Sequence, residues 1–165
     1  MLPTFNQKDL DMTATAKREF VPITIAVLTI TDTRDEQTDK SGNYLAEAVK
    51  QAGHNLHGKV IVKDDMYSIR AQISQWIADP EIQTIITTGG TGFSQRDVTP
   101  EAIRPLLDKE IPGFGEYFRT ISMEQVGTST IQSRALAGTA NNSYIFSLPG
   151  SGNACKTGWE DILQQ

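Results

Sequence analysis

Residues 82–102 read IQTIITTGGTGFSQRDVTPEA, and this run contains three successive residue patterns. Its first seven residues are rich in Ile and Thr, which is typical of a strand inside a sheet. A glycine-rich loop follows. Thr99 and Pro100 then place a favoured N-cap residue before the residue favoured at the first helical position. The run therefore predicts a strand, a loop and a helix, and Pro105 predicts that this helix is short or kinked.

The same order of elements repeats outward from this run. The apolar stretch VPITIAVLTI at 21–30 predicts a strand buried on both faces, and a helical period begins at Asn43 and stops at Gly53. Further elements are expected as a strand at 59–63, a helix over 69–77, a helix over 115–126, a strand at 143–148 and a final helical segment at 154–159. Because strands and helices alternate throughout, we expect an α/β fold with a mostly parallel sheet covered on both faces.

Length, charge and cysteine content limit the class of protein. The chain has 165 residues, and we expect a flexible arm at 1–19 and a single domain at 20–165. One cysteine permits no internal disulfide, so we expect a cytoplasmic protein. No apolar run approaches the roughly 20 residues that span a bilayer. A net charge of -5 without a basic cluster disfavours nucleic acid as a partner.

The glycine-rich loop is the most specific candidate site. Gly89, Gly90 and Gly92 allow a ligand to approach the backbone closely, and the helix that follows presents its positive dipole end to an anion. Arg96 and Asp97 add a cation and a carboxylate beside the same loop. The alternative is an ordinary glycine turn. The loop is neither a Walker loop nor a dinucleotide fingerprint, because the residues of both motifs are missing.

Two further loops carry candidate residues. Asp64 and Asp65 directly follow a predicted strand, and carboxylates there suit Mg²⁺, which also takes phosphate oxygens of a substrate. The alternative is that Asp65 or Ser68 caps the next helix. The turn Pro149-Gly150-Ser151 lies between a strand and a helix and could hold a ligand ring or phosphate, although an ordinary helix start explains it nearly as well. His54 and His57 have no further metal-ligating residues at the spacing of a metal site. We expect Cys155 and Trp159 to pack in the core.

Three ordered motifs resemble a known family. The segments TTGGTGFSQRDVTPEA at 87–102, IPGFGEYFR at 111–119 and SLPGSGNACKTGWE at 147–160 are similar to those of the molybdopterin adenylyltransferases and related molybdenum cofactor biosynthesis proteins. The resemblance covers the chain from about Val21 to its end. It implies a three-layer α/β/α molybdopterin-binding domain that assembles as a homotrimer or as a hexamer.

The resemblance also implies an activity. Active members of the family use Mg²⁺ and ATP to convert molybdopterin to adenylylated molybdopterin and pyrophosphate. The two central aspartates of the family fall on Asp64 and Asp97, as catalytic residues and as metal ligands. Residues implied to bind molybdopterin or ATP are Thr31, Asp32, Gly89, Gly90, Thr91, Gly92, Arg96, Pro149, Gly150 and Ser151. A rival hypothesis is a non-catalytic protein that binds or carries molybdopterin.

Two departures from the family pattern stand out. Lys63 occupies the place before the first aspartate where adenylyltransferases often have proline, and the chain stops soon after Trp159. These departures bear on the conformation of that loop and on assembly more than on the fold.

Overall fold

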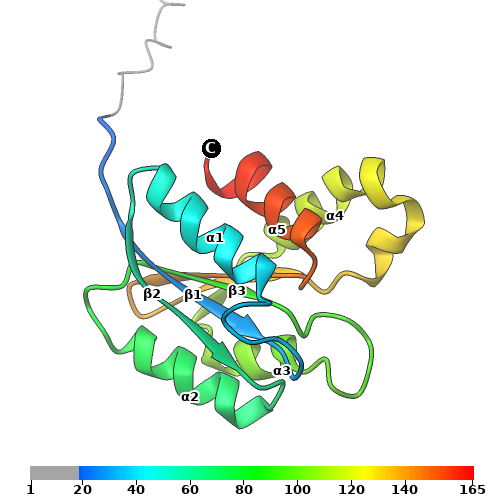
Figure 1. The fold of residues 1–165 in the computed structure, drawn as a ribbon, viewed down its shortest axis with the longest axis horizontal. Helices are drawn as coiled ribbons and strands as arrows, with labels where there is room; N and C mark the ends of the chain where they lie inside the picture. The colour runs from blue at the N-terminus through cyan, green and yellow to red at the C-terminus, as the bar shows by residue number, and fades with distance from the viewer. Residues whose placement is uncertain (1–18) are drawn as a thin grey trace, which may run out of the picture.

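The computed structural model describes residues 19–165, so all but the last residue of the predicted arm lies outside the described residues. One six-stranded sheet runs in the order β2-β1-β3-β6-β5-β4. The strands are β1 (Thr24–Ile30), β2 (Asn55–Val62), β3 (Thr84–Thr88), β4 (Lys109–Glu110), β5 (Leu136–Ala140) and β6 (Ser143–Leu148). The first four strands in the sheet order are parallel, and β5 and β4 are antiparallel to their neighbours. Figure 1 shows β2, β1 and β3 side by side.

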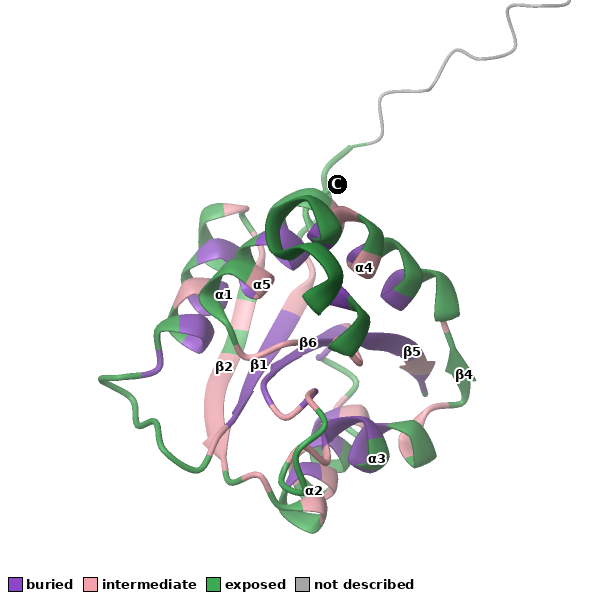
Figure 2. Ribbon diagram, turned by 90° about the vertical axis from the view of Figure 1, so that its right-hand side faces the viewer, coloured by how far each residue is buried: buried purple, intermediate pink, exposed green. Residues whose placement is uncertain are grey.

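Helices cover both faces of the sheet, which confirms the predicted three-layer α/β/α architecture. Helices α1 (Lys40–Gln51), α4 (Pro112–Val126) and α5 (Gly152–Gly158) lie on one face. Helices α2 (Met66–Ile77) and α3 (Thr99–Ile103) lie on the other, as Figure 2 shows. Three shorter helical turns are η2 (Arg104–Leu106), η3 (Gly127–Gln132) and η4 (Trp159–Leu163). In residues 19–165, no helix has the length and apolarity that a membrane crossing requires.

Strand β1 is covered on both faces of the sheet, which explains why its sequence is almost continuously apolar. Along β1, Ile25 and Val27 face the core under α1, α4 and α5, whereas Ala26 and Leu28 face the core under α2 and α3. Successive side chains of a strand point to opposite faces, so a strand covered on both sides has no solvent-facing position. Cys155 belongs to the first core, as predicted. Burial raises the pKa of its thiol to about 11, which keeps it protonated and unreactive.

The strict alternation of strands and helices is wrong in the second half of the chain. After α4, the chain forms η3 and then the hairpin of β5 and β6, which turns at Asn141 with a φ of 53°. The sequence of β5, LAGTA, contains small residues and a glycine, and such residues give a weak strand signal. Gly138 is nevertheless required there, because a Cβ would lie 2.6 Å from the Lys109 carbonyl oxygen of β4.

The helix after the glycine-rich loop is short, as Pro105 predicts. It holds five residues and tightens into η2. Its N-cap is Val98, which makes no side-chain capping bond, so the prediction of Thr99 as the N-cap is wrong. The hydroxyl of Thr99 instead donates a hydrogen bond of 2.9 Å to the Gly89 carbonyl oxygen. Thr99 therefore fixes the loop rather than the helix.

A buried carboxylate anchors the loop between β1 and α1. Asp39 is fully buried and is the N-cap of α1, where it accepts a hydrogen bond from the Gly42 amide at 2.9 Å. It also accepts from the Thr29 hydroxyl at 2.7 Å and from Lys59 Nζ at 3.2 Å. Lys59 pairs in addition with the exposed Glu36 at 2.8 Å. Burial tends to lower the pKa of Lys59, but these two carboxylates outweigh it and raise the pKa.

We predict that Asp39→Ala lowers the free energy of unfolding by roughly 2–4 kcal/mol, because it removes a helix cap and leaves the buried Thr29 hydroxyl without a hydrogen-bond acceptor. Glu36→Ala is the matched control, since it removes the other carboxylate on the same lysine. That carboxylate is exposed, so we expect a loss of about 1 kcal/mol or less. Urea denaturation of both variants measures the difference, and equal losses would contradict this role of Asp39.

Candidate functional site

Loops that follow four parallel strands meet at one edge of the sheet. They follow β1, β2, β3 and β6, and together they line a cavity of about 690 Å³. The cavity lies where the chain order reverses, with β2 on one side of β1 and β3 on the other, which is the usual ligand position in open α/β sheets. All of the predicted site residues line it: Thr31, Asp32, Asp64, Gly89, Gly90, Thr91, Gly92, Arg96, Asp97, Pro149, Gly150 and Ser151.

The glycine-rich loop has a backbone that other residues cannot easily adopt. Gly89 and Gly90 have φ values of 107° and 64°, in the region that favours glycine. A Cβ on Gly89 would collide with the Ile30 carbonyl oxygen at the end of β1. A Cβ on Gly90 would collide with the Thr99 hydroxyl and lie 2.9 Å from Asp64 Oδ1. The glycines therefore let the loop approach β1 and the carboxylate of the neighbouring loop.

Asp64 carries a carboxylate oxygen that nothing in the described chain satisfies. Its Oδ1 is buried and has no hydrogen-bond partner among the described residues. Burial raises the pKa of Asp64, and the negative charges of Asp97 and Asp32 raise it further. The backbone amide of Asp64 donates to Asp32 Oδ1 at 3.2 Å, which ties the loops after β2 and β1 together. Asp64 lines the cavity, and a carboxylate with an oxygen that lacks a hydrogen-bond partner is suited to a cation brought by a ligand.

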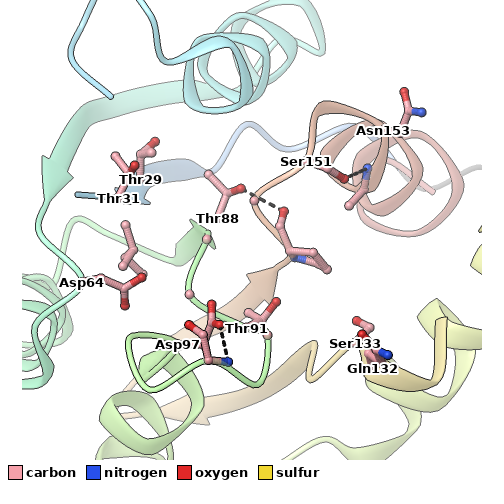
Figure 3. Close-up of a pocket in the computed structure, with 18 of the residues that line it drawn as sticks. Thr29, Thr31, Asp64, Thr88, Thr91, Asp97, Gln132, Ser133, Ser151 and Asn153 are labelled. Carbon is pink, nitrogen blue, oxygen red and sulfur yellow. Dashed lines mark hydrogen bonds between the residues drawn. The ribbon is translucent and has the colours of Figure 1, made fainter. Parts of the chain in front are cut away.

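Asp97 has the opposite electrostatic setting. Burial acts to raise its pKa, but hydrogen bonds from Ser94 and the positive charge of Arg134 outweigh burial, and its pKa is lowered. The Ser94 amide donates to Asp97 Oδ2 at 2.8 Å. Figure 3 shows Asp64 and Asp97 reaching the cavity from two different loops. The two carboxylates therefore differ in hydration and partners although they share one cavity.

The residues around these aspartates fit a magnesium ion held jointly with a substrate. No group of three or more His, Cys, Asp or Glu side chains placed to hold a metal occurs in residues 19–165. Mg²⁺ needs fewer protein ligands than that, since it is usually bound by one or two carboxylates together with substrate phosphates. The carboxylate of Asp64, which lines the cavity and has an oxygen without a hydrogen-bond partner, would be one such ligand.

Arg96 lines the cavity beside the glycine-rich loop, as predicted, and it is paired with a carboxylate of another loop. Its guanidinium is largely exposed, with 76% of the side chain accessible, and pairs with Asp32 Oδ2 at 2.9 Å. This ion pair connects the loop after β3 with the loop after β1. Arg96 thus lines the cavity as a partner of Asp32 rather than as a free cation.

The turn after β6 is held by residues from three other segments. The Thr88 hydroxyl donates to the Pro149 carbonyl oxygen at 3.0 Å, and Ser41 and Arg34 donate to the Gly150 carbonyl oxygen at 3.0 and 3.1 Å. A Cβ on Gly150 would lie 3.2 Å from the Cα of Gly89, so the two glycine turns pack against each other. The Ser151 side chain caps α5 by accepting from the Ala154 amide.

One wall of the cavity was missed by the sequence analysis. It comes from α4 and η3 and from the residues just after η3: Phe118, Ser122, Gln125, Val126, Ser129, Thr130, Gln132 and Ser133. Figure 3 places Gln132 and Ser133 across the cavity from Asp64. The polar run GTSTIQS at 127–133 was the available signal. It could not be assigned to the site because η3 has no apolar period and its position depends on α4.

We predict that Asp64→Asn stabilises the protein at neutral pH. The pKa of Asp64 is raised in the folded state, so ionisation of its carboxyl destabilises the folded protein. This cost is complete once the pH lies above the raised pKa, and it is absent below the ordinary pKa of 3.8. Asparagine has a similar shape and no charge. Thermal melts should therefore give a higher midpoint for the variant at pH 7 and equal midpoints near about pH 3. A lower midpoint at pH 7 would contradict the desolvation of Asp64.

The fold and the site together define an α/β protein with a glycine-lined cavity at the switch point of its parallel sheet. Comparison with known proteins makes this more specific. Residues 26–165 match the model of a family described as the probable molybdopterin binding domain, and the chain belongs to that family.

Individual relatives agree with this assignment. The chain is 52% identical over 145 residues to molybdenum cofactor biosynthesis protein B of Escherichia coli K12. This alignment covers 88% of this chain and 85% of the relative. Among solved structures, a molybdenum cofactor biosynthesis protein B has a TM-score of 0.85 at 42% identity and covers 89% of this chain and 92% of its own. The tungsten cofactor synthesizing protein MoaB from Pyrococcus furiosus has a TM-score of 0.77 at 38% identity, with coverage of 86% and 91%.

Proposed function

We propose that this chain binds molybdopterin and ATP in the 690 Å³ cavity and transfers AMP to the terminal phosphate of molybdopterin. The observation that carries the proposal is the convergence of Asp64, with its unpartnered buried oxygen, and Asp97 on one glycine-rich loop. Molybdopterin as the ligand is supported by the family, whose members are described as probable molybdopterin-binding domains. The cavity volume lies within the usual range of about 300–1,000 Å³ for small-molecule sites.

The proposed reaction needs no protein nucleophile. A phosphate oxygen of molybdopterin attacks the α-phosphorus of ATP, a new P–O bond forms, and the bond from the α-phosphorus to the bridging oxygen breaks to release pyrophosphate. The main difficulty is to hold two polyanions together in line and to offset the charge that develops. The inert thiol of Cys155 agrees with a reaction in which no covalent enzyme intermediate forms.

The chain's residues have separable roles in this proposal. Asp64 and Asp97 hold Mg²⁺ jointly with the phosphates of ATP. Bound there, Mg²⁺ would polarise the α-phosphate and offset the charge of the departing pyrophosphate. Gly90 and Gly92 keep side chains out of the space between the loop and these carboxylates. Pro149 and Gly150 form a second turn, which packs on Gly89 and lines the same cavity.

We also propose that the protein works as a homotrimer or hexamer. Four large apolar side chains of α4 and η3 are at least half exposed: Tyr117, Met123, Val126 and Ile131. An assembly would cover side chains of this kind, and contiguous exposed apolar surface marks protein–protein contact sites. Closed cyclic symmetry would bury the same surface on every subunit.

The function is tested by incubating purified protein with molybdopterin and Mg-ATP and identifying the pterin product by mass spectrometry. The proposal expects a product that is heavier by one AMP unit and requires all three components. Equilibrium titration of molybdopterin in the same buffer separates the rival carrier function, which predicts tight binding without a product. Retention of unmodified molybdopterin in the presence of Mg-ATP would overturn adenylyl transfer.

A further inference from the structure

One arginine from outside the predicted motifs holds the glycine-rich loop at both of its ends. Arg134 precedes β5 and lies behind the loop. Its backbone amide donates to the Thr91 carbonyl oxygen at 3.3 Å, and its Nε donates to the Gly92 carbonyl oxygen at 2.8 Å. Its Nη2 donates to the Asp97 carbonyl oxygen at 2.6 Å. The Arg134 side chain therefore bridges Gly92 and Asp97, in addition to the hydrogen bond from the Ser94 amide to the Asp97 carboxylate.

The same guanidinium is itself fixed from two further directions. Nη1 forms an ion pair with Glu101 of α3, and the guanidinium carbon lies 5.2 Å from the centre of the Phe93 ring. The side chain is 21% exposed, so these contacts are partly shielded from water. Phe93 is 72% exposed and has little other burial to hold it. Arg134 therefore ties the tip of the loop, both of its ends and the following helix into one unit.

We infer that Arg134 is a positioning residue that holds the Asp97 backbone, and with it the carboxylate, in the orientation needed for AMP transfer. This inference rests on the proposed function. A planar guanidinium reaches several carbonyl groups at once, which a lysine ammonium on a flexible stem cannot do. Misplacement of a reacting group by about 1 Å can cost as much as 100-fold in rate. Positioning by Arg134 therefore predicts a large effect on turnover although Arg134 itself contacts no reacting atom.

The test compares Arg134→Lys and Arg134→Met with the wild type. Both variants should lower the kcat of AMP transfer about 10- to 100-fold and change the KM for molybdopterin much less. Amide hydrogen exchange of the ligand-free protein should become faster over residues 91–98 and stay unchanged in β1 and α1. Wild-type kcat in Arg134→Lys would overturn the inference, because charge alone would then suffice.

Arg104→Lys is the matched control. Arg104 lines the same small surface pocket as Arg134, but it pairs with Glu110 at 3.3 Å and makes no hydrogen bond to the glycine-rich loop. The Arg104→Lys variant should have the wild-type kcat and the wild-type rate of amide hydrogen exchange over residues 91–98. A role in overall stability alone would give a different result. The Arg134 variants would then show faster amide exchange throughout the chain and a lower melting temperature, but the wild-type kcat at temperatures well below melting. That result would overturn the inference.

Two further outcomes are distinguishable. If the wild type transfers no AMP, the proposed function fails, and the exchange experiment still decides whether Arg134 holds the loop. If neither Arg134 variant folds, Glu101→Gln loosens the guanidinium without removing it. Faster exchange confined to residues 91–98 is then expected, and unchanged exchange there would overturn the inference.

Discussion

Asp64→Asn is expected to slow AMP transfer at least about 100-fold while the protein stays folded, a loss of the size seen when one group that stabilises a transition state is removed. The substitution keeps the shape of the side chain and removes the charge that would hold Mg²⁺. It also replaces one of the two carboxylate oxygens by an amide nitrogen, which cannot ligate a cation. Single-turnover kinetics at saturating Mg-ATP measure the effect, and Asp97→Asn should behave similarly.

The neighbouring aspartate gives a close control for this experiment. Asp65 is exposed and is the N-cap of α2, where it accepts a hydrogen bond from the Ser68 amide at 2.8 Å. Asparagine caps helices about as well as aspartate, so Asp65→Asn should keep both the fold and the rate. The sequence offered capping and metal binding as alternatives for this pair, and the structure gives capping to Asp65. A transfer rate for Asp64→Asn within threefold of the Asp65→Asn rate would exclude Asp64 from the chemistry.

Gly92→Ala is expected to reduce AMP transfer at least about 10-fold with little loss of stability. A Cβ on Gly92 would lie 2.8 Å from Asp97 Oδ2, so the carboxylate must move. Gly92 is absent from the glycines with positive φ, and alanine there brings no backbone strain. A shift of a catalytic group by a fraction of the size of a methyl group is enough to misalign a reaction. Thermal melts beside single-turnover rates separate the two effects.

Gly90 and Gly58 complete this comparison. Gly90→Ala combines a positive φ with a collision at Thr99, so it should lose about 1–3 kcal/mol of stability as well as activity. A Cβ on Gly58 of β2 meets open space, so Gly58→Ala should retain the wild-type rate. If Gly92→Ala binds and transfers like Gly58→Ala, the loop is an ordinary turn and the anion site lies elsewhere.

The sequence predicts best where a single local pattern has a single structural outcome. The run of β1 predicts a strand covered on both faces, because it is nearly continuously apolar and its polar residues are only the β-branched Thr24 and Thr29. The sequence predicts that Gly89, Gly90 and Gly92 allow close approach to the backbone; Gly89 and Gly90 have a positive φ, whereas Gly92 does not. Pro105 predicts a short helix, since its ring cannot occupy a helix interior without cost.

Features that depend on distant partners could not be predicted from the sequence. Strand β5 is recognisable only beside β6, because its own residues have low strand preference. Thr99 fits an N-cap pattern, but its hydroxyl donates a hydrogen bond to the Gly89 carbonyl oxygen instead of capping the helix. Arg134 lies 42 residues from Gly92 along the chain, and no local spacing indicates that contact. The wall formed by η3 was missed for the same reason.

The most direct test of the central claim follows the fate of the α-phosphate in a single turnover. Protein in excess over ATP labelled in its α-phosphate is mixed with molybdopterin and Mg²⁺, quenched at intervals and separated. If the protein transfers AMP, the label moves to the pterin and one pyrophosphate appears for each AMP transferred, in the wild type and in Asp65→Asn but not in Asp64→Asn. Label that stays in ATP while molybdopterin is bound to the wild type would exclude AMP transfer.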